Sequence, residues 1–151
     1  MRELRWILQL NVLLLLSSSF QNKEDETYPL TVKVKDLRNE NGVVQFALYN
    51  TNGSIPDEEY TKYYRKSTAK IKNRSAEITF LNLPRGKYAV NVLHDEDKDG
   101  KVKKGLILPK EGIGFSNFTS LKISNRPSFT KAAFEFTEEK EIEVHMIYFL
   151  F

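Results

Sequence analysis

The 151-residue sequence contains no cysteine. Disulfide bonds, thiolate metal sites and cysteine nucleophiles are therefore excluded, and so is a bacterial lipid anchor on a cysteine after the leader. A domain of this length can bury a core without covalent cross-links. Its stability must come from burial of aliphatic and aromatic side chains, which include 10 phenylalanines and 7 tyrosines.

The sequence also lacks a strong excess of one charge. It has 23 Lys and Arg residues against 20 Asp and Glu, a formal net charge of +3, and the two signs are interleaved along most segments. A nucleic-acid-binding protein normally concentrates its positive charges on one face. We therefore expect no nucleic-acid partner.

No apolar run reaches the roughly 20 residues that a membrane-spanning helix needs. The run from Trp6 to Leu16 follows two arginines and precedes three serines, an order typical of a signal peptide. The mature chain is then exported, to the periplasm or outside the cell, and has no membrane span. We predict a signal peptide over residues 1–19, a polar linker over 20–28 and one domain over 29–151.

Most of the chain alternates between apolar and polar residues, as strands do. Leu30, Val32 and Val34 predict a half-buried strand, and Asn41-Gly42 predicts a tight turn that joins it to the next strand in a hairpin. Short strands at regular spacing, with almost no helix, predict an all-β antiparallel sandwich of about seven strands, similar to immunoglobulin domains. The other expected strands are Val43–Tyr49, Thr68–Lys72, Ala76–Leu81, Lys87–Leu93, Thr119–Ile123, Lys131–Phe136 and Glu139–Phe149.

One short helical element is expected after Ser54, which is a suitable N-cap residue. Tyr60, Tyr63 and Tyr64 then fall on one side at helical spacing. A tyrosine stripe of this kind usually docks on a sheet and keeps its hydroxyl groups in water. Stacking on a sugar or base, or docking of a separate sheet in an envelope structure, are the alternatives.

The most informative stretch is the loop that follows the strand Lys87–Leu93. Asp95, Asp97 and Asp99 stand at alternate positions and are followed by Gly100. Calcium loops place oxygen ligands in this way, because the backbone wraps the ion and glycine makes the sharp turn. The sequence therefore predicts a calcium site, although it follows a strand and not a helix.

Two further ligands would complete this site, and a simpler structure competes with it. The Lys101 carbonyl lies where calcium loops use a backbone oxygen, but Leu106 stands at the twelfth position, so Glu111 would have to fold back. Alternatively, nearby lysines neutralise the aspartates and the loop is a turn without an ion.

Catalysis is the other hypothesis that this region raises. His94, Asp95 and Ser116 are the residue types of a hydrolase triad, but neighbours on a strand point to opposite faces. We therefore expect no catalytic residues, and expect His94 to be bonded to the backbone. A small periplasmic enzyme or accessory subunit built on His94, Asp95 and Glu111 is the alternative.

Several motifs together resemble one family of exported bacterial proteins. They are Leu83-Pro84-Arg85-Gly86-Lys87-Tyr88-Ala89-Val90, His94-Asp95-Glu96, Pro109-Lys110-Glu111-Gly112-Ile113-Gly114-Phe115-Ser116-Asn117 and Pro127-Ser128-Phe129 before Ala132-Ala133-Phe134. The chain from about Leu30 to Tyr148 resembles domain-of-unknown-function family 2141, which has no assigned activity. The resemblance implies a sandwich akin to transthyretin-like and carboxypeptidase-regulatory modules. It also implies an acidic loop that commonly has asparagines at the places of Asp97 and Asp99.

Taken together, these patterns predict a secreted, noncatalytic β-sandwich that serves as a binding or structural module. Its partner would be a protein, a peptide or a carbohydrate presented to the loops at one end of the sheets. Calcium is the one cofactor that the sequence suggests.

Overall fold

The computed structural model describes residues 26–103, 105, 109–122 and 124–149. Residues 1–25, which include the predicted signal peptide and most of the predicted linker, lie outside this range, as does Leu106. In the described residues, no helix is long and apolar enough to cross a membrane. The elements are β1 (Thr27–Val34), β2 (Val43–Tyr49), β3 (Arg65–Ala69), β4 (Ala76–Pro84), β5 (Gly86–Asp95), β6 (Gly112–Phe115), α2 (Phe129–Ala132), β7 (Phe134–Phe136) and β8 (Lys140–Glu143).

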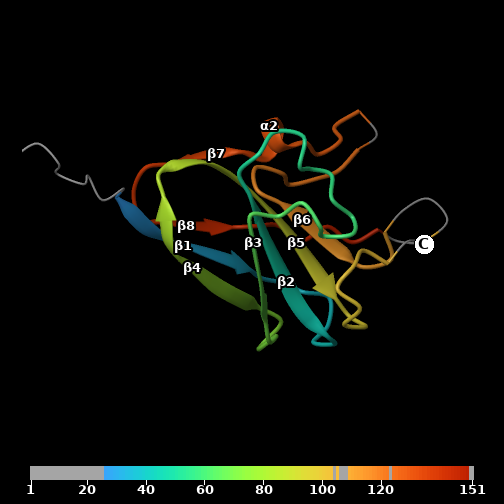
Figure 1. Cartoon of the computed structure of the whole chain (residues 1–151). Helices are drawn as coiled ribbons and strands as arrows, with labels where there is room; N and C mark the ends of the chain where they lie inside the picture. Colours follow the sequence, from blue (N-terminus) through green and yellow to red (C-terminus); the bar gives the residue numbers. More distant parts are fainter. Residues whose placement is uncertain (1–25, 104, 106–108, 123, 150–151) are drawn as a thin grey trace, which may run out of the picture.

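The strands form two sheets that face each other (Figure 1). The first sheet has the order β4-β1-β8, and the second has the order β3-β2-β5-β6, with β7 also paired to β5. The pairs are antiparallel except for β1 and β8, which run parallel. The predicted all-β sandwich is confirmed, with eight strands and one short helix in the described residues. The predicted hairpin of the first two strands is wrong, because β1 and β2 lie in different sheets.

The second sheet is buried on both faces. The first sheet covers one face. Its residues Leu30, Val32 and Val34 of β1 pack with Phe46 and Val92 of the second sheet in one core cluster. The opposite face carries a second cluster that includes loop residues from both halves of the chain. Strands buried on two sides have near-continuous apolar sequences, which explains why β2 and β5 do not alternate cleanly.

The predicted helix after Ser54 is wrong. Residues 54–64 form turns, because the Asp57 carboxylate accepts hydrogen bonds from the backbone N–H groups of Thr61 and Lys62, at 3.1 and 2.8 Å. These are N–H groups that a helix would direct to carbonyls one turn back. The tyrosine stripe is therefore divided: Tyr60 is buried at 2% exposure, whereas Tyr63 and Tyr64 are about 40% exposed.

Three differences from the predicted strands affect the C-terminal part of the described residues. Residues 129–132 form α2, where the sequence predicted a strand from Lys131, because Ser128 caps this turn by accepting a hydrogen bond from the Lys131 N–H. The predicted strand 139–149 is divided, since β8 ends at Glu143 and Ile147 then pairs with Ile113 of the other sheet. In the predicted strand 119–123, the described residues contain only a bridge between Lys122 and Asn125.

Candidate functional site

The acidic loop begins where β5 ends. Asp95 is the last residue of β5 and is 2% exposed. Its Oδ1 accepts a hydrogen bond from the Asp99 N–H at 3.1 Å, and its Oδ2 accepts one from the Gly100 N–H at 2.9 Å. Gly100 has a φ of +78°, which favours glycine. The chain is thereby folded around the Asp95 carboxylate.

This folding brings the three predicted aspartate ligands together. One carboxylate oxygen from each of Asp95, Asp97 and Asp99 lies within 4.8 Å of the others. Calcium binds oxygen ligands at about 2.3–2.6 Å, so oxygens that share one ion lie at most about 5 Å apart. The separation in this loop therefore fits a shared cation. Asp97 and Asp99 are exposed to water.

Lys103 neutralises part of this cluster. Its ammonium group lies 2.5 Å from Oδ2 of Asp97, and this contact lowers the pKa of the Asp97 carboxyl and raises the pKa of Lys103. Both side chains are largely exposed, so the ion pair contributes little to stability. A cation that bound Asp97 through this oxygen would have to displace the ammonium group.

Glu111 stands behind the loop and holds its backbone. The side chain is 2% exposed, and its two oxygens accept hydrogen bonds from the N–H groups of Glu96, at 2.9 Å, and Lys103, at 3.0 Å. Burial raises the pKa of this carboxyl. Glu111 does fold back towards the loop, but it is not among the clustered aspartates. Its oxygens are used to join the two ends of the loop, while a role of the Lys101 carbonyl as a ligand stays a prediction.

A second acidic residue anchors the start of the loop to the β1–β2 connection. Both Glu96 oxygens accept from the Arg38 guanidinium at 2.6 Å, and Asn39 Nδ2 donates to Oε1 at 2.9 Å. The guanidinium lowers the pKa of the Glu96 carboxyl. Gly42 packs directly against the backbone at the end of β5, because a Cβ atom at this position would lie only 1.9 Å from the Asp95 carbonyl oxygen. The loop therefore rests on a tightly fitted base.

His94 belongs to this base and is fully buried. Its Nε2 lies 3.0 Å from the Asn41 carbonyl oxygen, and its Nδ1 lies 2.8 Å from the Tyr148 hydroxyl. A carbonyl can only accept, so Nε2 carries a proton and donates to Asn41, while Nδ1 is hydrogen-bonded to the Tyr148 hydroxyl. His94 thus joins the loop region to the end of the chain, and one of its partners is the backbone carbonyl of Asn41.

Ser116, the nucleophile of the triad hypothesis, forms hydrogen bonds with the backbone instead. The Ser116 hydroxyl accepts from the Val90 N–H at 2.9 Å and donates to the Ala132 carbonyl at 2.7 Å. Neither ring nitrogen of His94 has Asp95 or Ser116 among its hydrogen-bond partners in the described residues. The geometry therefore lacks the nucleophile–base contact on which a triad depends.

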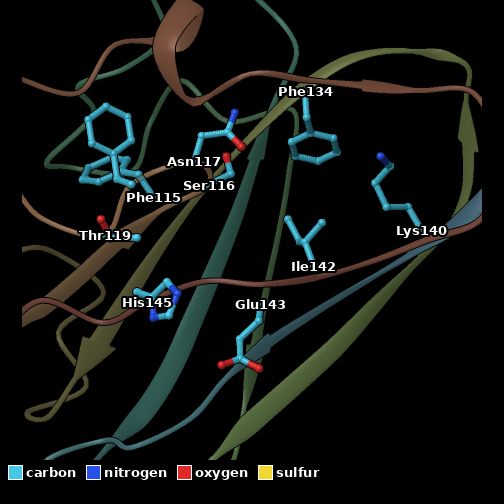
Figure 2. A pocket seen from close by; sticks show the side chains of 10 residues that line it. Phe115, Ser116, Asn117, Thr119, Phe134, Lys140, Ile142, Glu143 and His145 are labelled. Carbon is cyan, nitrogen blue, oxygen red and sulfur yellow. The ribbon is translucent and has the colours of Figure 1, made fainter.

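A separate cleft of about 440 Å³ lies between the edges of the two sheets (Figure 2). Its walls come from residues 115–119 on one side and from β8 and the residues after it on the other. Figure 2 shows Ile142 pointing towards Phe134, whereas Glu143 points away from it. The sequence analysis did not identify this cleft, because its residues come from three separate segments. Its lining is Phe115, Ser116, Asn117, Phe118, Thr119, Phe134, Lys140, Ile142, Glu143 and His145.

Comparison with known proteins identifies the family. The model of the bacterial family "Uncharacterized protein conserved in bacteria (DUF2141)" matches residues 32–144. The chain belongs to the DUF2141 family. Comparisons with curated proteins and with solved structures give no match. The predicted resemblance is confirmed, and the match includes both the acidic loop and the segment that supplies Glu111.

Proposed function

We propose that this DUF2141 protein is an exported, noncatalytic binding or structural module whose Asp95–Lys101 loop is ordered by calcium. The observation that carries the proposal is the convergence of Asp95, Asp97 and Asp99 to within 4.8 Å at the end of β5. Three carboxylates so close repel one another, and a shared divalent cation removes that repulsion. Export is proposed from the leader-like sequence at the N-terminus.

The surroundings of the loop favour weak binding. Lys103 holds one oxygen of Asp97, and both oxygens of Asp95 and of Glu111 already accept backbone hydrogen bonds. A site of this kind suits the range of about 10⁻⁴ to 10⁻³ M that is typical of extracellular calcium modules. Lys103 therefore competes with the ion and sets the affinity.

Thermal unfolding with and without calcium tests the proposal. For a Kd of about 1 mM, 10 mM calcium would stabilise the fold by about 1.4 kcal/mol, which raises the Tm by several degrees. Asp97→Ala combined with Asp99→Ala removes both side-chain oxygen ligands and should abolish the shift, and Glu135→Gln on β7 should leave it unchanged. Lys103→Met should enlarge it. If 10 mM calcium does not move the Tm of the natural protein, the loop is a self-neutralised turn and the calcium proposal is wrong.

A further inference from the structure

We propose that the cleft between β8 and the Phe115–Thr119 segment binds an extended peptide, which pairs with β8 and alternates basic with apolar residues. The inference rests on the binding role proposed above, but neither on calcium nor on the acidic loop. It specifies the partner as a polypeptide strand and names the surface that receives it.

The first argument is the free edge of β8. The sheet order β4-β1-β8 places β8 at an edge of the described sheet. The Val144 N–H donates to the Lys33 carbonyl of β1 at 2.9 Å. Because backbone groups alternate between the two sides of a strand, those of Ile142 point to β1, and those of Glu141 and Glu143 point away from it. These outward groups can bond an added strand.

The second argument is the apolar lining beside this edge. Phe134 and Ile142 face each other and remain partly exposed (Figure 2). The rings of Phe115 and Phe118 also line the cleft. After β8, Ile147 pairs with Ile113 of β6. A strand beside β8 would direct every second side chain towards these aromatic rings. Those positions of the peptide should be apolar.

The third argument is the pattern of charge on the outer face of the first sheet. The Lys33 ammonium of β1 lies 3.6 Å from Glu77 of β4 and 2.8 Å from Glu141 of β8. One step along, Lys35 lies 2.7 Å from Glu143. The charge of the outward side chains therefore alternates from strand to strand across the sheet, and the edge strand β8 carries two glutamates. A further strand continues the pattern when it carries Lys or Arg at the outward positions, since opposite charges on neighbouring strands attract.

The chain itself supplies a suitable probe. Within residues 30–35, Leu-Thr-Val-Lys-Val-Lys, residues 30–33 pair with β8 from the other side, and Lys33 and Lys35 form ion pairs with Glu141 and Glu143. A capped peptide of this sequence has the required alternation. Its matched control replaces both lysines with glutamate and keeps the apolar residues.

The test is a titration of the isotope-labelled protein with each peptide, followed by the backbone amide signals of residues 141–145. We expect saturable shifts with the lysine peptide and at least tenfold weaker binding of the glutamate peptide. Glu143→Pro should weaken binding at least tenfold, because it removes an outward N–H that β1 does not use. Glu143→Ala removes only the charge and should weaken binding two- to fivefold. Melting curves show that each variant is folded.

Three outcomes would overturn the inference. They are the absence of shifts at millimolar peptide, equal binding of the two peptides, and unchanged binding to a folded Glu143→Pro variant. A dimer that dissociates in this variant would identify a second copy as the occupant instead. The calcium-induced change in Tm is measured separately, so failure here and failure of the calcium proposal are distinguishable.

Discussion

Replacement of Glu111 by glutamine should loosen the acidic loop and destabilise the fold. The carboxylate accepts from two backbone N–H groups, and hydrogen bonds to charged groups contribute about 1.5–3 kcal/mol each. Glutamine keeps one acceptor oxygen and turns an N–H₂ group towards the other amide, which leaves a buried donor unpaired. Glutamine also avoids the desolvation that raises the pKa of Glu111. Because this gain partly offsets the loss, we expect a net destabilisation of about 1–2 kcal/mol at pH 7.

The assay is thermal unfolding followed by circular dichroism, together with amide hydrogen exchange. A loss of about 1–2 kcal/mol lowers the Tm by roughly 4–8 °C in a domain of this size. Exchange at the N–H groups of Glu96 and Lys103 should accelerate, whereas exchange in the centre of β5 should change only with global stability. Glu111→Leu leaves both amides unpaired and should cost more than Glu111→Gln. If the Glu111→Gln variant has a Tm within about 1 °C of the natural protein and protects both amides equally well from exchange, the conclusion that Glu111 holds the loop backbone is wrong.

Three other substitutions test an ion pair at the start of the loop, the close fit of Gly42 and the hydrogen bonds of Ser116 to β5 and α2. Glu96→Gln should be less stable than the natural protein by about 1–2 kcal/mol at pH 6. The difference should shrink as the pH falls below 4.5, because folding lowers the pKa of the Glu96 carboxyl and its stabilising effect is lost as that group becomes protonated in the folded protein; a constant difference would contradict this. Gly42→Ala should lower the free energy of unfolding, measured with denaturant, by more than about 3 kcal/mol because its Cβ meets the Asp95 carbonyl. Gly53→Ala is the control: it has a similar φ but open space around it, and should lower the free energy of unfolding by about 1 kcal/mol. Equal effects would exclude the steric explanation. Ser116→Ala should cost about 1–3 kcal/mol by removing the acceptor of the buried Val90 N–H, whereas the Ala132 carbonyl keeps a hydrogen bond from Asn117 Nδ2; a neutral result would show that water replaces the hydroxyl.

The strand pattern of the sequence was sufficient for the fold class but not for every element. Alternation in β1 and the Asn-Gly turn before β2 are local signals, and the structure has both strands close to where they were predicted. β1 begins at Thr27, two residues before the predicted domain boundary. The failed helix after Ser54 shows the limit of such signals. Asp57 satisfies backbone N–H groups there through its side chain, a contact that helical spacing does not reveal.

The candidate site was predictable where its residues are close in sequence. The alternation of Asp95, Asp97 and Asp99 was sufficient to predict their convergence. Glu111 was identified as a residue that folds back to the loop, but its binding to backbone amides depends on how β6 pairs with β5. The contribution of Tyr148 to the base of the loop had no sequence signal, because the contact joins segments 54 residues apart.

A calcium titration of the isotope-labelled protein tests whether calcium orders the Asp95–Lys101 loop. The account predicts saturable shifts of the amide signals of residues 95–103, with a Kd of about 10⁻⁴ to 10⁻³ M and no comparable response to magnesium. The Asp97→Ala, Asp99→Ala variant, which lacks both side-chain oxygen ligands, should show none of these shifts. Amide signals in the loop that stay unchanged up to 10 mM calcium would contradict the claim.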